Sequence, residues 1–185
     1  MKRHPQILNR KQTALLIVDV QERINAVMHH RQTVVESILK LIKTCQILDV
    51  PIFITEQYPK GLGATEAEIL AALGDTTPIQ KMTFSCCGDA GLLTQLEQKN
   101  IRQVIVTGIE CHVCVQQTAL DLLAHHLQVH IPRDAVSSRK LLDYETALDR
   151  MAKTGAVLTT VESAVFELLE KAGTTEFKQV ARLIK

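Results

Sequence analysis

The sequence predicts an α/β fold, a three-layer sandwich of helices around a six-stranded parallel sheet. Short apolar runs alternate with segments of helical periodicity along the whole chain. The runs are nearly continuous in apolar residues, as expected for strands that are covered on both faces. Right-handed crossovers then favour the doubly wound topology, with strand order 3-2-1-4-5-6. Because the chain has neither an internal repeat nor a Pro/Gly-rich linker, residues 1–185 are predicted to form one domain.

The elements follow one another in strict alternation. The first strand is the apolar run 13–18, and the helix after it is identified by apolar residues three or four positions apart, from Val34 to Cys45. The remaining predicted strands are 51–55, 79–84, 104–107, 128–131 and 156–160. The predicted helices are 31–48, 65–73, 89–99, 112–126, 143–154, 162–171 and an amphipathic C-terminal segment, 178–185.

Composition limits the classes of function. Hydrophobic residues make up 46% and charged residues 22% of the chain, as in ordinary globular proteins. A net charge of +1 without a basic run, together with 3% aromatic residues and no Trp, argues against a nucleic-acid partner. No apolar run is long enough to span a membrane, and the first residues do not resemble a signal peptide. The five cysteines, an odd number, favour free thiols in a cytoplasmic protein without a membrane partner.

Cys114 is the strongest candidate for chemistry. It follows a buried strand and a Gly turn, in the predicted first turn of the next helix. Unpaired N–H groups and the helix dipole favour a thiolate there, so we expect its pKa to lie below the usual value of about 8.5. A nucleophile at the carboxyl edge of a parallel sheet suits an enzyme. An inert buried thiol is the alternative interpretation.

Asp19 and Lys81 also lie at or near strand ends, and strands one and four are neighbours in the predicted order. A carboxylate beside a thiol can accept its proton, and a cation can hold the resulting charges. The separate alternatives are a helix cap or exposed loop acid for Asp19 and a solvated edge lysine for Lys81. The loop 56–63 follows a strand and is predicted to form part of the rim of the site. The predicted substrate contacts are Glu56, Gln57, Tyr58, Phe84 and His112.

Two other roles for the cysteines are weaker. Cys111 and Cys114 form a C-x-x-C pair, as in thiol–disulfide oxidoreductases, but that function would leave Asp19 and Lys81 unused. A zinc site built from both of these with Cys86 and Cys87 is disfavoured, because adjacent residues of a strand point to opposite faces. No metal or other cofactor is predicted.

Three short motifs, which lie at or near the ends of the first, third and fourth predicted strands, resemble those of a known family. Asp19-Val-Gln21, Lys81-Met-Thr-Phe-Ser85 and Gly108-Ile-Glu-Cys-His-Val-Cys-Val115 resemble those of the cysteine hydrolases of the isochorismatase-like superfamily, which includes nicotinamidases and N-carbamoylsarcosine amidohydrolases. The similarity extends from Thr13 to Leu169. The loop 55–63 is similar to that of the isochorismatase-domain-containing branch.

The resemblance implies a mechanism. Cys114 would be the nucleophile, Asp19 the general base, and Lys81 the group that orients Asp19 and stabilises developing charge. A cis peptide is implied between Ile109 and Glu110, and the backbone N–H groups of Glu110 and Cys114 would form an oxyanion hole. The implied reaction is hydrolysis of a small-molecule amide or related C–N bond through a thioester, by a homo-oligomer.

Departures from the family narrow this expectation. The residues 55–58 contain no His where nicotinamidases bind a metal, which argues against that metal and that activity. True isochorismatases lack the nucleophilic cysteine, so Cys114 argues against their reaction as well. A non-catalytic oligomeric scaffold that keeps the pocket remains an alternative to the hydrolase.

Overall fold

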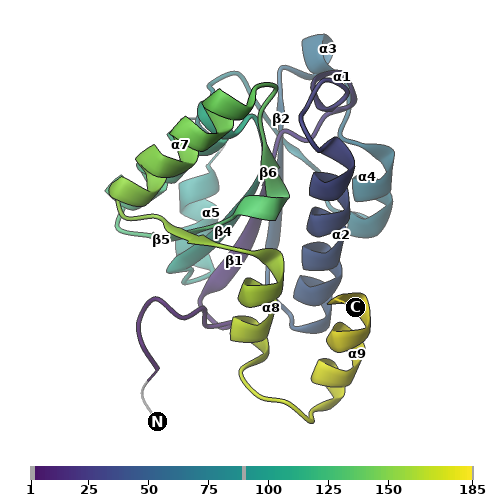
Figure 1. The fold of residues 1–185 in the computed structure, drawn as a ribbon, viewed down its shortest axis with the longest axis vertical. Coiled ribbons are helices and arrows are strands. Elements are labelled where there is room, and N and C mark those ends of the chain that lie inside the picture. The colour runs from purple at the N-terminus through teal and green to yellow at the C-terminus, as the bar shows by residue number, and fades with distance from the viewer. Residues whose placement is uncertain (1–2, 89–90, 185) are drawn as a thin grey trace.

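A parallel sheet with the strand order β3-β2-β1-β4-β5-β7 forms the centre of the structure, a computed structural model that describes residues 3–88 and 91–184 (Figure 1). The strands are β1 (Thr13–Val18), β2 (Ile52–Gln57), β3 (Ile79–Lys81), β4 (Gln103–Ile109), β5 (Gln128–Pro132) and β7 (Val157–Thr159). This confirms the predicted order, since β7 is the sixth strand predicted from the sequence. One further strand, the two-residue β6 (Val136–Ser137), pairs with the end of β4.

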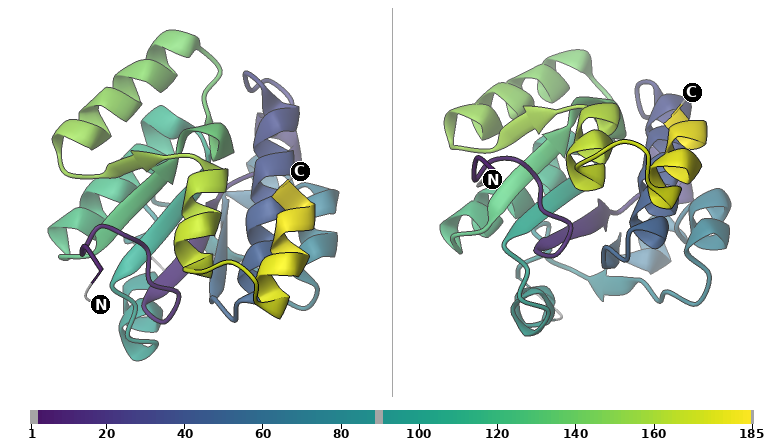
Figure 2. Two further views of the ribbon diagram at one scale, coloured as in Figure 1. Left: turned by 60° about the horizontal axis from the view of Figure 1, so that its bottom comes forward. Right: turned by 90° about the horizontal axis from the view of Figure 1, so that it is seen from below.

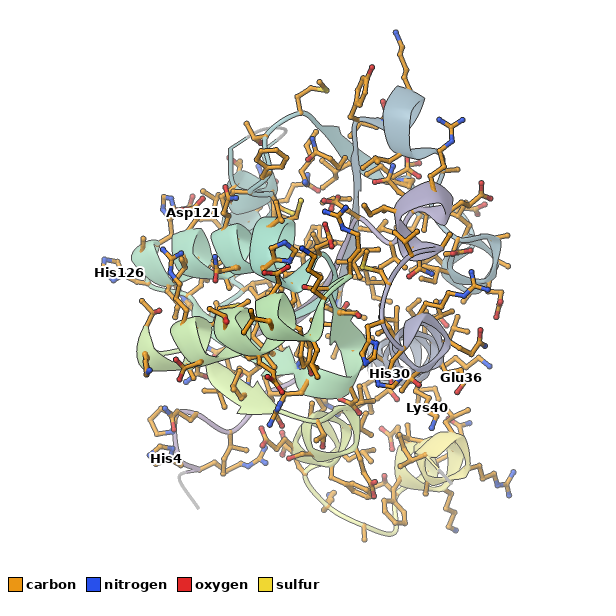
Figure 3. All side chains as sticks on the ribbon, turned by 45° about the horizontal axis from the view of Figure 1, so that its top comes forward. His4, His30, Glu36, Lys40, Asp121 and His126 are labelled. Atoms are coloured by element: carbon orange, nitrogen blue, oxygen red, sulfur yellow. The ribbon has the colours of Figure 1, made fainter. Side chains whose placement is uncertain are left out.

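Helices cover both faces of the sheet, as the three-layer prediction requires. One layer contains α2 (Arg31–Ile47), α4 (Ala67–Leu73), α8 (Val161–Leu169) and α9 (Thr175–Ile184). The other contains α5 (Leu92–Gln98), α6 (Gln116–Ala124) and α7 (Leu141–Lys153). Figure 2 shows α8 and α9 beside α2. In Figure 3, Asp121 of α6 lies on the opposite flank of the molecule from Glu36 and Lys40 of α2.

The alternation of side chains along β1 divides the core in two. Leu15 and Ile17 pack under the layer of α2, whereas Leu16 and Val18 pack under the layer of α6. All four side chains are fully buried, as expected for a central strand with helices on both sides. No helix among residues 3–88 and 91–184 is both long and apolar enough to cross a membrane.

The third strand is shorter than predicted. β3 ends at Lys81, and residues 82–87 are irregular rather than extended. The physical reason is local, because the Lys81 ammonium donates to the carbonyls of Thr83 and Phe84 and thereby curls the chain back on itself. Phe84 consequently lies at the surface, with 55% of its area exposed.

The ends of the chain's predicted helices differ slightly from the expectation. Of the helix predicted over 89–99 the structure shows α5: residues 89 and 90 lie outside the described residues, and Gly91 precedes the helix in a left-handed conformation with a φ of +70°. The C-terminal helix begins earlier than predicted, at Thr175, and its Val180 is fully buried in the core beneath α2. Short helical turns connect the longer elements: α1 (Glu22–Asn25), α3 (Pro59–Leu62), the π turn Cys111–Val115 and the 3-10 turn Arg133–Ala135.

The pairing of β1 with β4 positions the candidate residues. Val18 is opposite Gly108 in the ladder, so the chain beyond each strand emerges at the same edge of the sheet. Gly108 has a φ of +106°, and a Cβ there would lie 2.0 Å from the Val18 carbonyl oxygen. This close approach of two backbones brings Asp19 next to the segment that follows β4.

Candidate active site

Asp19 is held by two donors from neighbouring strands. It follows β1 in a left-handed backbone conformation (φ +51°) and is 2% exposed. The Thr55 hydroxyl of β2 donates to its Oδ1 at 2.7 Å, and the Lys81 ammonium of β3 donates to its Oδ2 at 2.7 Å. A buried carboxylate is stable only when it is paired and hydrogen-bonded, and here both oxygens are satisfied.

Lys81 is fully engaged by the protein. Besides Asp19, its Nζ donates to Gln57 Oε1 at 2.8 Å and to the carbonyl oxygens of Phe84 and Thr83 at 3.0 and 3.2 Å. Burial disfavours the ammonium, but the charge of Asp19, followed by those of Cys86 and Cys114, favours it more, so the pKa of Lys81 is raised. Lys81 therefore stays protonated at neutral pH and forms a buried ion pair with Asp19.

Cys114 lies in a π-helical turn rather than in the first turn of an α-helix. The π turn spans Cys111–Val115 and leads directly into α6. Such turns insert one residue into a helix and often occur at functional sites. The turn places the thiol, which is 6% exposed, close enough to Asp19 for charge and hydrogen bonding to act between them.

The predicted lowering of the Cys114 pKa is wrong for the resting protein. Burial raises the pKa of the thiol, and the adjacent Asp19 carboxylate raises it further, whereas Lys81 lowers it only in part. A negative charge beside a buried thiol thus outweighs the helix N-terminus. In the resting site the proton is therefore on the sulfur of Cys114.

Two backbone N–H groups at this turn, those of Glu110 and Cys114, are the ones that the resemblance assigns to an oxyanion hole. The Ile109–Glu110 peptide bond is cis, as the resemblance implied. The Glu110 carbonyl accepts from Val113 and Val115 at 3.0 and 3.2 Å. Within residues 3–88 and 91–184, the Glu110 N–H meets no acceptor, and the Cys114 N–H donates to nothing outside its own turn. The Glu110 side chain is anchored separately, by the backbone N–H and the guanidinium of Arg139 at 3.1 and 3.0 Å.

The predicted substrate contacts divide into distinct groups. The structure does not bring Glu56 to the site, because its Oε1 accepts from the N–H and hydroxyl of Thr65, both at 2.8 Å, on the other face of β2. Gln57 belongs to the hydrogen-bonded cluster around Asp19 and Lys81. Its amide oxygen accepts from Lys81 and its amide nitrogen donates to the Met82 carbonyl.

The other three predicted contacts lie around this cluster. Tyr58 is 47% exposed and lines an open hollow of about 720 Å³ together with Lys81. Phe84 is on the surface nearby, and its carbonyl rather than its ring contacts Lys81. The His112 ring contacts the Ser138 hydroxyl at 2.9 Å, so it points toward the segment after β6.

The sequence did not predict the role of three residues beside Asp19 and Lys81, although Gln21 ends the first family motif and Cys86 was considered as a zinc ligand. Thr55 supplies the second donor to Asp19, and Gln21 exchanges two hydrogen bonds with the backbone of Gln57, which fixes β2 beside β1. Cys86 contacts the Thr55 hydroxyl at 3.6 Å. The period of two along β2 could have identified Thr55, because it lies on the same face as Gln57.

In the segment where nicotinamidases bind a metal, the side chains of this protein hydrogen-bond to other protein groups. The hydroxyl of Thr55 is committed to Asp19, the carboxylate of Glu56 to Thr65, and the amide of Gln57 to Lys81. In the part of the chain that the structure describes, no three His, Cys, Asp or Glu side chains are grouped as metal ligands. These residues do not fit that metal ion.

Comparisons with known proteins point to one family. The isochorismatase domain model matches residues 13–163. Isochorismatase domain-containing protein 1 of Salmo salar is 37% identical over 94% of this chain, and the match spans 61% of the salmon protein's own length. The secreted isochorismatase effector Isc1 of Phytophthora sojae is 38% identical over 94% of this chain and 84% of its own.

Solved structures show the same fold. The MAR1 ribonuclease of Caenorhabditis elegans superposes with a TM-score of 0.89 at 39% identity, over 96% of this chain and 91% of that one. The YcaC gene product of Escherichia coli, an octameric hydrolase of unknown specificity, superposes with a TM-score of 0.89 over 99% of this chain and 92% of its own. At 20% identity the YcaC match concerns the fold alone. Taken with the domain match over residues 13–163, these similarities show that the chain belongs to the isochorismatase family.

Proposed function

We propose that this protein is a cysteine hydrolase that cleaves a small amide or related C–N bond through a thioester, without a metal ion. The observation that carries the proposal is the position of one carboxylate. Asp19 is close enough to the Cys114 thiol to raise the pKa of that thiol, while Lys81 and Thr55 hold the two oxygens of Asp19 in place. A base fixed beside a nucleophile, and itself oriented by a third group, is the pattern of nucleophilic acyl transfer.

The reaction begins with proton transfer from sulfur. Asp19 takes the proton of Cys114 as the sulfur attacks the substrate carbonyl, and the N–H groups of Glu110 and Cys114 bind the oxyanion. Protonated Asp19 then gives this proton to the leaving amine. Water, deprotonated by Asp19, hydrolyses the thioester and restores the thiol. Each oxyanion donor of this kind typically contributes about 3–4 kcal/mol to transition-state stabilisation.

Lys81 acts through Asp19 in this mechanism. Its ammonium has three protons and four acceptors within 3.2 Å, all of them protein atoms. It therefore orients the carboxylate of Asp19 and has no N–H to direct at the substrate. Gln57 is likewise a positioning residue, because its Oε1 accepts a hydrogen bond from the Lys81 ammonium and so helps to orient it.

Thiol alkylation tests the electrostatics of the site without a known substrate. The charge of Asp19 raises the pKa of Cys114 and that of Lys81 lowers it. Asp19→Asn should therefore move the midpoint of Cys114 alkylation to lower pH, and Lys81→Met should move it to higher pH. Cys45, whose pKa of about 12 is raised by burial alone, is the internal control and should not change. Midpoints of Cys114 that are unaffected by either variant would contradict the proposed pairing.

Turnover tests the reaction itself. A panel of small primary amides and N-carbamoyl compounds is assayed for ammonia release, and acid-quenched samples are searched for an acyl group on Cys114 by peptide mass spectrometry. Cys114→Ala should abolish both signals, and Cys111→Ser should leave them nearly intact. Loss of activity in Cys111→Ser would favour thiol–disulfide exchange instead. If Cys114→Ala retains full biological activity, the scaffold function is correct.

RNA belongs in the same assay because structural relatives are named MAR1 ribonucleases. The acyl-transfer proposal predicts no RNA cleavage that depends on Cys114, since the proposed nucleophile attacks a carbonyl carbon and not the phosphorus of a phosphodiester. We also propose a homo-oligomer, on the basis of the family resemblance, and sedimentation velocity measures the assembly directly.

A further inference from the structure

A second buried thiol lies against the helix that carries Cys114. Cys86 is 2% exposed and belongs to the same core cluster as Cys114. Its backbone N–H donates to the Thr118 hydroxyl at 2.9 Å. Thr118 lies four residues after Cys114 in the continuous run of helix, and residues spaced by four share one face of a helix. The irregular segment that follows β3 thus holds Cys86 against the helix that carries the proposed nucleophile, near enough for the charge of Cys86 to raise the pKa of Cys114.

A hydrogen-bonded chain links Cys86 to the same carboxylate that serves Cys114. The Thr55 hydroxyl has one proton, and it donates this proton to Asp19 Oδ1 at 2.7 Å. In its 3.6 Å contact with Cys86 Sγ, the hydroxyl must therefore be the acceptor and the thiol the donor. The pKa of Cys86 is raised to about 11, first by burial and then by the charge of Asp19, so the proton that this contact needs is present.

The other three cysteines lack this connection. Cys45 lies in the opposite half of the core, among the residues under α2. Cys111 is fully buried, and burial alone raises its pKa, to about 12. Cys87 is the sequence neighbour of Cys86, but its N–H is bound by the Ser85 hydroxyl and its side chain is partly exposed. Asp19 is therefore connected to two thiols of the five, Cys114 and Cys86.

We propose that Cys86 is a resolving thiol, which forms a reversible disulfide with Cys114 when a peroxide oxidises the site. The inference rests on the proposed function, because it requires Cys114 to be the activated nucleophile. In the first step Asp19 takes the proton of Cys114, and the sulfur attacks one oxygen of hydrogen peroxide. The O–O bond breaks, Cys114 becomes a sulfenic acid, and the departing hydroxide takes the proton from Asp19 to form water.

The second step uses the chain through Thr55. Asp19 accepts the proton of the Thr55 hydroxyl, which in turn takes the proton of Cys86. The Cys86 sulfur attacks the sulfur of the sulfenic acid, the S–O bond breaks, and hydroxide leaves with the proton from Asp19 as a second water. Two thiols and one peroxide thus give one disulfide and two waters. An external thiol reverses the reaction, and the disulfide prevents irreversible oxidation of Cys114.

Peptide mapping after peroxide treatment tests the proposal. The intact protein is treated with hydrogen peroxide, remaining thiols are blocked under denaturing conditions, and tryptic peptides are compared with and without reducing agent. The thiol pairs fall in peptides 82–99 and 103–133, each with two cysteines. Cys87→Ser and Cys111→Ser are therefore the matched controls, because each leaves a single cysteine in its peptide. A dimedone probe, which labels sulfenic acid, follows the intermediate.

The expected result is a cross-link between the two peptides in the wild type and in both control variants, and its loss in Cys86→Ser and Cys86→Ala. In those two variants Cys114 should accumulate dimedone-reactive and then sulfinic forms. The proposal is overturned if Cys114 of the wild type proceeds to sulfinic acid without a cross-link, or if the cross-link survives the loss of Cys86. Circular dichroism establishes that each variant is folded.

The same samples separate this inference from the proposed function. If Asp19→Asn and Lys81→Met shift Cys114 alkylation in opposite directions but no cross-link forms, only the resolving role of Cys86 is wrong. If neither variant changes the alkylation of Cys114, the proposed function itself has failed.

Discussion

Gly108→Ala should destabilise the sheet directly beneath the site. Gly108 pairs with Val18, and a Cβ at this position would lie 2.0 Å from the Val18 carbonyl oxygen and 2.7 Å from its nitrogen. Both are main-chain atoms, so no side-chain rotation can relieve the contact. To reach an ordinary contact of 3.4 Å, β1 and β4 must separate by more than an ångström.

The magnitude follows from two terms. A non-glycine residue in an unfavourable backbone conformation costs about 1–3 kcal/mol, and Gly108 has a φ of +106°. Separation of two central strands weakens several ladder hydrogen bonds, each of which contributes about 1 kcal/mol. Together these predict a loss of roughly 3–5 kcal/mol in the free energy of unfolding, which is a large effect for one methyl group.

Gly155→Ala is a matched control. Gly155 has nearly the same φ, +108°, but a Cβ there would have no atom within 4 Å. It should cost only the backbone term, about 1–3 kcal/mol. Urea unfolding followed by circular dichroism measures both variants, since the chain has no Trp for fluorescence. Equal losses in the two variants would refute the close approach of β1 and β4.

Three further predictions concern buried polar groups. Glu56→Gln should lower stability by about 1–2 kcal/mol, because Thr65 donates twice to this carboxylate, but should leave the alkylation midpoint of Cys114 unchanged. Thr55→Val removes a hydroxyl that donates to a buried carboxylate and should cost about 1.5–3 kcal/mol in chemical denaturation. Burial lowers the pKa of His130 to about 4 from an ordinary 6.5. Between these two pH values the unfolded chain protonates this imidazole and the folded protein does not. Stability should therefore fall by about 3 kcal/mol as pH drops from 6.5 to 4, and His130→Leu should flatten this part of the pH–stability curve.

The order of the sheet could be predicted because apolar patterning identifies the buried strands and the right-handed crossover rule favours the doubly wound order. The runs at 13–18 and 104–107 are covered on both faces, and their burial is complete in the structure. The strand β6 could not be predicted, because two residues carry no periodicity and form a strand only by pairing with the end of β4. The early end of β3 depends on where one lysine side chain finds its acceptors, which local sequence does not reveal.

The sequence predicted the three central residues of the proposed site but not the hydrogen bonds and charges that connect them. Asp19, Lys81 and Cys114 could be found because each stands near a strand end that the topology brings to one edge of the sheet. Their electrostatics could not be predicted, because the pKa of Cys114 depends on burial and on the distance to one carboxylate. Glu56 and Gln57 are adjacent in sequence, yet only Gln57 faces the cluster, since alternate residues of a strand point to opposite faces.

The saturation of Lys81 has a consequence for how a substrate arrives. The buried ion pair of Asp19 and Lys81 is neutral when seen from outside, and Cys114 carries its proton at rest. Because the pair has no net charge, its field is that of a dipole and decays quickly with distance, so a neutral amide would enter without long-range electrostatic steering from this centre. The association rate constant of the substrate should consequently be insensitive to ionic strength.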